Sequence, residues 1–209
     1  VLPADYITGV KALADRRGLS THLDGARLFN AAVYIARQRG IPVFDAARDI
    51  CKSFNSISIC LSKGLGAPVG SLLLGDKALI ARAHRLRKMI GGGMRQAGII
   101  AAAGQFALDH HIDRLADDHA NAALLAQGLV KASRGQLSVD PPQTNILWVV
   151  YPPAMGDAFT AHLKANGILV SAAYGKQRWV THLDVSRADI ERSVQVVADY
   201  FDNAVKNQH

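Results

Sequence analysis

The chain has 209 residues, of which 49% are hydrophobic, enough to bury a sizeable core. Nothing in it approaches an 18-residue apolar span, and its two cysteines, Cys51 and Cys60, have no metal-ligand spacing, which argues against a membrane protein, a disulfide scaffold and a metal site. The formal net charge of +7 suggests nucleic-acid binding, but the basic run at residues 82–88 has no interleaved aromatic side chains, so we set that function aside. We expect a protein of the reducing cytoplasm, because no signal peptide precedes the cysteines.

The periodicity of apolar residues and the positions of glycine and proline predict helices and strands along the whole chain. A capping box at Ser186 and Asp189 marks the start of the last helix. In chain order, we predict a helix at residues 4–16, a strand at 20–23, helices at 26–38 and 43–50, strands at 56–61 and 69–74, helices at 76–89 and 94–110, a long helix at 112–131, strands at 137–139 and 145–151, a helix at 157–166, strands at 168–173 and 179–185, and a final helix from 186.

Lys63 stands at the end of an alternating, strand-like run and directly before a turn that contains Gly64, Gly66 and Gly70. A Schiff-base lysine is presented in this way, because the glycines let the backbone fold tightly around a bulky ligand. A surface lysine that leaves a strand has the same local pattern. This motif alone leaves both interpretations open.

Asp24 follows another short strand and precedes a helical pattern. Ligands of parallel α/β sheets bind beyond the carboxyl ends of the strands, and the separation of Asp24 from Lys63 suits one strand-helix-strand crossover. We therefore expect the two residues to end neighbouring strands and to face one crevice. A carboxylate and an amine are what pyridoxal phosphate requires of a protein, because the lysine holds the aldehyde and the carboxylate keeps the pyridine nitrogen protonated. The alternative for Asp24 is a helix N-cap.

Four ordered motifs, at residues 22–30, 62–71, 88–98 and 178–186, closely resemble those of the low-specificity L-threonine aldolases. The resemblance implies an α/β fold of pyridoxal-phosphate fold type I, represented here by the C-terminal part of the large, mostly parallel-sheet domain and a small α/β C-terminal domain. It implies a partial cofactor-binding domain at residues 1–111, a bridging helix at 112–135 and the small domain at 136–209.

The resemblance also implies that about two fifths of a full-length aldolase precede Val1. That part would contain the loop that holds most of the cofactor phosphate and a histidine that stacks on the pyridine ring. We therefore expect the chain to be a fragment, which binds no cofactor tightly by itself and has a separate N-terminal chain as one conceivable partner.

The same resemblance implies roles for individual residues. Lys63 and Asp24 would be the catalytic and cofactor-binding pair, and Arg27 would touch the cofactor ring oxygen. Lys88 and Arg95 would reach the cofactor of a neighbouring subunit, which implies a homo-oligomer, a dimer of dimers in the family. Arg95 follows three glycines and is expected to open a helix, whose N-terminus would help it to meet a phosphate.

Arg178 fits the family's carboxylate-binding position and is expected to begin a strand. The local alternatives are a surface role for Arg178, a salt bridge on the first helical turn for Arg27 and a plain helix break at residues 91–93. Neither His22 nor His182 is assigned as the catalytic base: we expect His22 to support Asp24, and His182 to be a hydrogen-bonded core residue within a strand.

The expected reaction is retro-aldol cleavage of L-threonine, L-allo-threonine and related β-hydroxy-α-amino acids to glycine and an aldehyde. Two alternatives stay open at this point. One is another fold type I lyase or aminotransferase, which would use the same carboxylate and lysine. The other is a catalytically silent fragment that only assembles with a partner chain.

Overall fold

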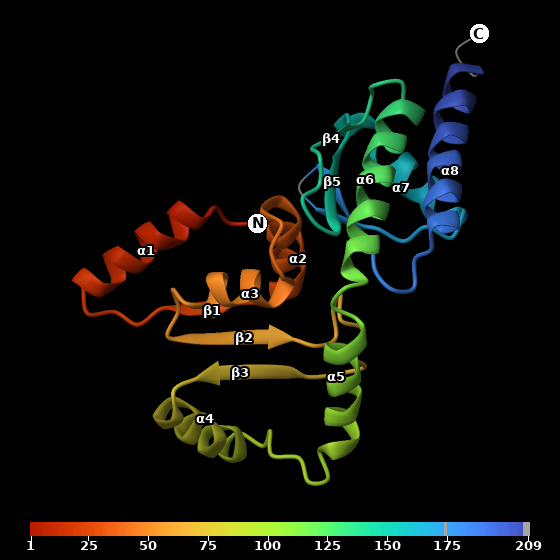
Figure 1. The fold of residues 1–209 in the computed structure, drawn as a ribbon. Helices are drawn as coiled ribbons and strands as arrows, with labels where there is room; N and C mark the ends of the chain where they lie inside the picture. The colour runs from red at the N-terminus through yellow and green to blue at the C-terminus, as the bar shows by residue number, and fades with distance from the viewer. Residues whose placement is uncertain (174, 207–209) are drawn as a thin grey trace. The chain divides into compact units, whose positions relative to one another are not determined.

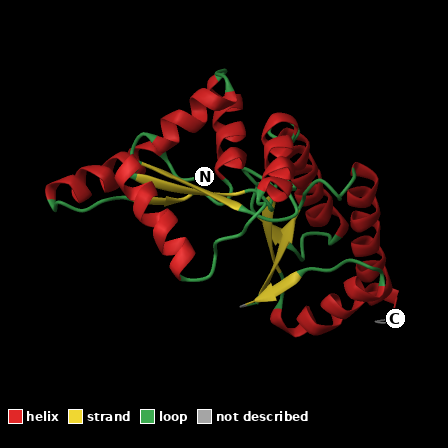
Figure 2. Ribbon diagram, turned by 90° about the horizontal axis from the view of Figure 1, so that it is seen from below, coloured by secondary structure: helices red, strands yellow, loops and turns green. Residues whose placement is uncertain are grey.

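The computed structural model describes residues 1–173 and 175–206, and its contacts divide the chain into two units, Val1–Ala116 and a second that begins at Asp117 (Figure 1). Both units contain helices and strands (Figure 2). Every segment predicted from the sequence has a counterpart. The elements are α1 (Ala4–Arg16), β1 (His22–Asp24), α2 (Leu28–Arg39), α3 (Val43–Cys51), β2 (Ser56–Cys60), β3 (Ser71–Gly75), α4 (Lys77–Met89), α5 (Gly98–His110), α6 (Leu115–Ala132), β4 (Ser138–Val139), β5 (Ile146–Val150), a 3-10 turn (Pro153–Met155), α7 (Gly156–Ala165), β6 (Ser171–Ala173), β7 (Lys176–Val180) and α8 (Arg187–Lys206).

The sheet of the first unit has the strand order β1-β2-β3. Strands β1 and β2 are parallel, with His22 opposite Ser56 and Asp24 opposite Ser58. Strands β2 and β3 are antiparallel. The parallel pair is connected through α2 and α3, which pack on each other beside the strands (Figure 1). The carboxyl ends of β1 and β2 therefore lie next to each other.

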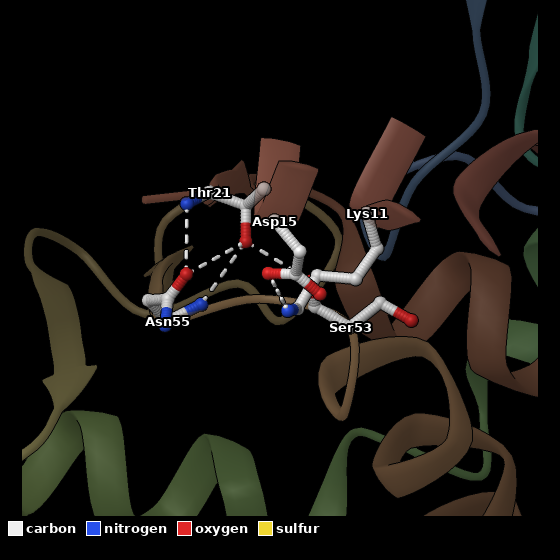
Figure 3. A network of polar contacts seen from close by, with 5 residues as sticks. All are labelled: Lys11, Asp15, Thr21, Ser53 and Asn55. Carbon is white, nitrogen blue, oxygen red and sulfur yellow. Dashed lines mark hydrogen bonds and ion pairs between the residues drawn. The ribbon is translucent and has the colours of Figure 1, made fainter. Parts of the chain in front are cut away.

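A polar network at the opposite ends of these strands fixes their register (Figure 3). The backbone N–H of Thr21, just before β1, donates to Asn55 Oδ1 at 2.9 Å, and the Thr21 hydroxyl donates to the Ser53 carbonyl at 3.0 Å. The backbone N–H of Asn55 in turn donates to the Thr21 carbonyl at 2.9 Å. Because Thr21 is buried, these bonds are shielded from water and fix the alignment of β1 with β2.

The core of the first unit forms between α2 and the strands. Helix α2 buries Phe29, Ala32, Val33 and Ala36, which lie on one helical face, and β2 contributes Ile59. Gly40 ends α2 in the left-handed conformation, with φ of 65°. Helices α1 and α4 contribute little to this core: α1 buries one alanine and α4 buries no residue.

The second unit packs helices α7 and α8 against a four-stranded sheet of order β4-β5-β7-β6, in which every neighbouring pair is antiparallel. Leu147, Trp179, Phe159 and Phe201 belong to its core and are almost completely buried. The capping box predicted at Ser186 is confirmed, since its hydroxyl and the Asp189 carboxylate bond each other's backbone N–H groups. No helix among the described residues is long and apolar enough to cross a membrane.

Candidate active site

Asp24 and Lys63 follow the carboxyl ends of adjacent parallel strands, as predicted. Asp24 is the last residue of β1, and Lys63 comes three residues after Cys60, the last residue of β2. The strands stay close beyond Asp24, because the Gly25 N–H donates to the Ser58 carbonyl at 2.8 Å. An acid and an amine therefore stand at the edge of the sheet where ligands of α/β proteins bind.

The alternative role of Asp24 as a helix N-cap is wrong. Its Oδ1 atom accepts a hydrogen bond from the Ala26 N–H at 3.1 Å, which closes a local turn, and α2 begins only at Leu28. Arg27 is the N-cap residue of α2 and makes no side-chain cap. The exposed Asp24 carboxylate has no cationic partner among the described residues, so it is available to a ligand.

The loop after β2 holds Lys63 in a defined turn. The Gly66 N–H donates to the Lys63 carbonyl at 2.9 Å, and Gly66 has φ of 71°, which favours glycine. Gly64 packs so closely that a Cβ there would lie 2.9 Å from the Asn30 amide nitrogen. The Lys63 side chain itself is exposed and has no ion-pair partner among the described residues.

A histidine that the sequence did not indicate supports this loop. His111, at the end of α5, hydrogen bonds through Nδ1 to the Leu65 carbonyl at 2.6 Å. Its ring also packs edge-on against Phe106. The bond joins residues 46 positions apart, so no local pattern could have revealed it.

The pKa of the Cys60 thiol is lowered by neighbouring groups at the start of the Lys63 loop. Burial alone would raise the pKa of Cys60, but hydrogen bonds with Ser62 and the positive charge of Lys63 outweigh it and lower the pKa. The Sγ atom of Cys60 lies 3.3 Å from the Ser62 hydroxyl oxygen. Cys51, in contrast, has a pKa raised by burial. The charge of Lys63 therefore adds to the hydrogen bonds with Ser62 in lowering the pKa of Cys60.

Arg27 lines two hollows at this edge of the sheet. With Cys60 and Gly64 it borders a small cavity of about 10 Å³, and with Asp24 and Gly25 it borders an open pocket of about 190 Å³. Arg27 therefore borders the hollows next to Asp24 and next to the loop that carries Lys63.

Arg95 does not open a helix, contrary to the prediction. Helix α5 begins at Gly98, and Gln96 has φ of 50°, a left-handed conformation that no α-helix can include. Lys88, at the end of α4, lies against the glycine turn, because a Cβ on Gly93 would be 2.7 Å from Lys88 Cδ. The structure therefore puts Lys88 and Arg95 at two ends of one exposed turn, and their cofactor role stays a prediction.

Arg178 lies in the second unit, in the middle of β7 and not at its start as predicted. The strand begins two residues earlier, since Lys176 pairs with Val150 of β5. Arg178 is exposed, whereas its neighbours Gln177 and Trp179 are buried. Its guanidinium group is held on a central strand and has no carboxylate partner among the described residues.

The expectations for the two histidines need correction. His182 follows β7 and is half-buried, with its Nδ1 accepting a bond from the Asp184 N–H at 3.3 Å, so it is not a core residue of a strand. His22 lies in β1 and is hydrogen bonded through Nδ1 to the Ser56 hydroxyl at 2.8 Å, so its partner is across the sheet and not Asp24.

The fold is that of the pyridoxal-phosphate enzymes of fold type I. It matches the crystal structure of a putative L-allo-threonine aldolase from Listeria monocytogenes with a TM-score of 0.75 and 19% identity, over 97% of this chain and 57% of that chain. It also matches the threonine aldolase of Leishmania major with a TM-score of 0.70 and 20% identity, over 95% of this chain and 56% of that one.

The chain belongs to the beta-eliminating lyase family, whose model matches residues 1–151. It is 43% identical over 190 residues to the low specificity L-threonine aldolase of Escherichia coli K12, covering 91% of this chain and 54% of the relative. It is also 43% identical over 194 residues to the probable low-specificity L-threonine aldolase 2 of Arabidopsis thaliana, covering 91% of this chain and 52% of the relative. The chain thus spans about half the length of the curated relatives it matches.

Enzymes of this family depend on pyridoxal phosphate, and the residues of the first unit fit that cofactor. The fit rests on the donor set: an exposed amine and an exposed carboxylate follow adjacent parallel strands, and neither has an ionic partner among the described residues. The predicted roles of Lys63, Asp24 and Arg27 are to hold the cofactor aldehyde, ring nitrogen and ring oxygen.

Proposed function

We propose that the full-length protein is a pyridoxal-phosphate-dependent aldehyde-lyase that cleaves L-threonine, L-allo-threonine and related β-hydroxy-α-amino acids to glycine and an aldehyde. The observation that supports it most directly is the placement of Asp24 and Lys63 after the adjacent carboxyl ends of β1 and β2. The names of the relatives, low-specificity L-threonine aldolases, support the choice of reaction.

When bound, pyridoxal phosphate supplies an electron sink for the pair left on the α-carbon as the bond between the α- and β-carbons breaks. Lys63 would bind the cofactor aldehyde covalently through Nζ. The Asp24 carboxylate would hold the proton on the ring nitrogen, because an opposite charge at contact distance commonly raises the pKa of a cationic group by about one to three units. Arg27 would donate a hydrogen bond to the ring oxygen.

Arg178 would hold the carboxylate of the substrate. A guanidinium group can grip a carboxylate with two parallel hydrogen bonds, which fixes the rotation of the amino acid as well as its position. That rotation determines which bond of the α-carbon is broken. The central position of Arg178 on β7 supports this role, since a strand paired on both sides holds its side chains in defined directions.

We further propose that the protein acts as a homotetramer in the cytoplasm. Lys88 and Arg95 would reach the cofactor of a neighbouring subunit from the exposed turn that they flank. Both cysteines are free thiols, which agrees with a reducing compartment. Analytical ultracentrifugation of the full-length protein, with and without Lys88→Ala, tests the assembly.

The products decide between this function and its alternatives. Incubation of the full-length protein with L-threonine and pyridoxal phosphate should release glycine and acetaldehyde in equal amounts. Release of ammonia would favour a β-eliminating lyase, and conversion of an added keto acid to an amino acid would favour an aminotransferase. Absence of all three would indicate a catalytically silent protein.

Borohydride reduction followed by peptide mapping tests the lysine. The pyridoxyl label should lie on Lys63 and should be lost in Lys63→Ala, together with the visible absorbance of the bound cofactor. A label on Lys52 or Lys88 would show that Lys63 is not the attachment site.

A further inference from the structure

A row of side chains crosses the outward face of the second unit's sheet at the level of Arg178. Strand β7 lies between β5 and β6, and Arg178 is directly opposite Trp148 on one side and Ser171 on the other. Residues directly opposite in an antiparallel pair point to the same face, with Cβ atoms about 4.5–5.5 Å apart. The burial agrees, since Gln177 and Trp179 point into the core while Trp148 is 42% exposed. The Arg178 and Trp148 side chains therefore leave the sheet next to each other, on the same face.

Lys176 holds that indole ring on the outward face. Its Nζ atom lies 4.6 Å from the centre of the Trp148 ring, a cation–π contact. Lys176 is two residues before Arg178, so both cations and the ring share one face. No carboxylate among the described residues pairs with either cation. The row thus combines two cations that have no carboxylate partner among the described residues with the large apolar surface of the indole ring.

This combination suits an amino acid that has an apolar or aromatic side chain. The β-carbon of an amino acid is two bonds from its carboxylate carbon, so a carboxylate held by Arg178 brings the β-substituent within reach of the neighbouring side chains. Indole offers a large apolar face that pairs well with another ring, whereas Ser171, on the other side, offers only a hydroxyl group.

We propose that Trp148 is a specificity-determining residue, which contacts the β-substituent of the substrate and favours β-aryl substrates over those with a small β-substituent. The proposal rests on the proposed function, and in particular on Arg178 as the carboxylate-binding residue. Lys176 acts as a positioning residue for the ring.

The test compares kcat/KM of the full-length protein for L-threonine and for L-threo-phenylserine. Trp148→Ala should lower the value for phenylserine by about tenfold, as expected for loss of one aromatic pair with its buried area, and should change the value for threonine by less than about threefold. Trp148→Phe should retain most of the preference. Lys176→Met keeps the apolar stem but removes the charge, so it should give an intermediate ratio.

Val150→Ala is the matched control, because Val150 is exposed on the same face of β5, two residues from Trp148. It should leave the substrate ratio unchanged. Inhibition constants of L-phenylalanine and L-alanine give a second measure, which needs no bond cleavage: Trp148→Ala should weaken only L-phenylalanine. Trp148→Leu replaces the ring by another apolar group in case the alanine variant fails to fold.

An unchanged substrate ratio in Trp148→Ala and Trp148→Leu, or an equal change in Val150→Ala, would overturn the proposal while leaving the aldolase function intact. A wild-type protein that cleaves neither substrate would overturn both.

Discussion

Replacing Gly25 by alanine tests whether the close approach of β1 and β2 positions Asp24. The Gly25 N–H donates to the Ser58 carbonyl at 2.8 Å, and a Cβ on residue 25 would lie 2.8 Å from that same oxygen and 3.4 Å from Ile57 Cγ2. The oxygen belongs to the backbone of β2, so it cannot rotate away as a flexible side chain would. The end of β1 must therefore move, and Asp24 must move with it.

The size of the effect follows from the cost of overpacking. A methyl group forced into a filled space costs about 1–3 kcal/mol, and we expect the free energy of unfolding to fall by that amount. If cofactor binding must restore the original position of Asp24, the same free energy weakens the affinity for pyridoxal phosphate. Since about 1.4 kcal/mol is a factor of ten, the dissociation constant should rise by about 5- to 150-fold.

Urea unfolding and an absorbance titration with pyridoxal phosphate, both on the full-length protein, measure these two quantities. Gly9→Ala is the control, because Gly9 lies in the exposed middle of α1 with no atom within 4 Å of its added Cβ. It should be neutral or stabilising by about 0.5–1 kcal/mol, with unchanged cofactor affinity. Wild-type stability and affinity in Gly25→Ala, or an equal loss in Gly9→Ala, would refute the reasoning.

Further variants test the remaining roles. Asp24→Asn should retain the cofactor but lower the rate of glycine release by about a hundredfold or more, because the ring nitrogen loses its charged partner; near-normal turnover would leave Asp24 as a turn former only. Arg178→Lys keeps the charge but loses the pair of parallel hydrogen bonds to the substrate carboxylate, so KM for threonine should rise by about tenfold. An unchanged KM would show that another residue binds the substrate carboxylate. Ser186→Ala removes the capping hydroxyl of α8 and should lower the free energy of unfolding by about 1 kcal/mol in a urea titration. At pH near 7.5, iodoacetamide should modify Cys60 before Cys51, because the pKa of Cys60 is lowered and that of Cys51 is raised; the reverse order in a peptide map would contradict these directions of the two pKa shifts.

The sequence predicted the parts of the fold that depend on local pattern. The alternation of residues 56–61 located β2, the following glycines located the Lys63 turn, and Ser186 with Asp189 located the start of α8. The neighbouring ends of β1 and β2 followed from the general topology of α/β sheets. These predictions needed only side-chain period, capping chemistry and chain length.

Features that depend on distant partners were missed. The start of β7 was hidden because Gln177, a polar residue, points into the core, where it donates to the Thr160 hydroxyl and accepts from the Trp179 indole N–H. The start of α5 was missed because Gln96 adopts a left-handed conformation, which a glutamine in the sequence does not indicate. The support of the Lys63 loop by His111 joins two segments that only the tertiary fold brings together.

The parallel pairing of β1 with β2 has a consequence for the order of folding. Their facing residues His22 and Ser56 are 34 positions apart, whereas β2 and β3 are joined by a loop of roughly a third of that length, and closing the longer segment costs about 1 kcal/mol more in chain entropy. The antiparallel pair β2 and β3 is therefore expected to form first, and β1, which carries Asp24, is expected to join the sheet last. A ligand that binds only the completed edge shifts this final step by mass action, so pyridoxal phosphate present during refolding should raise the yield of native protein.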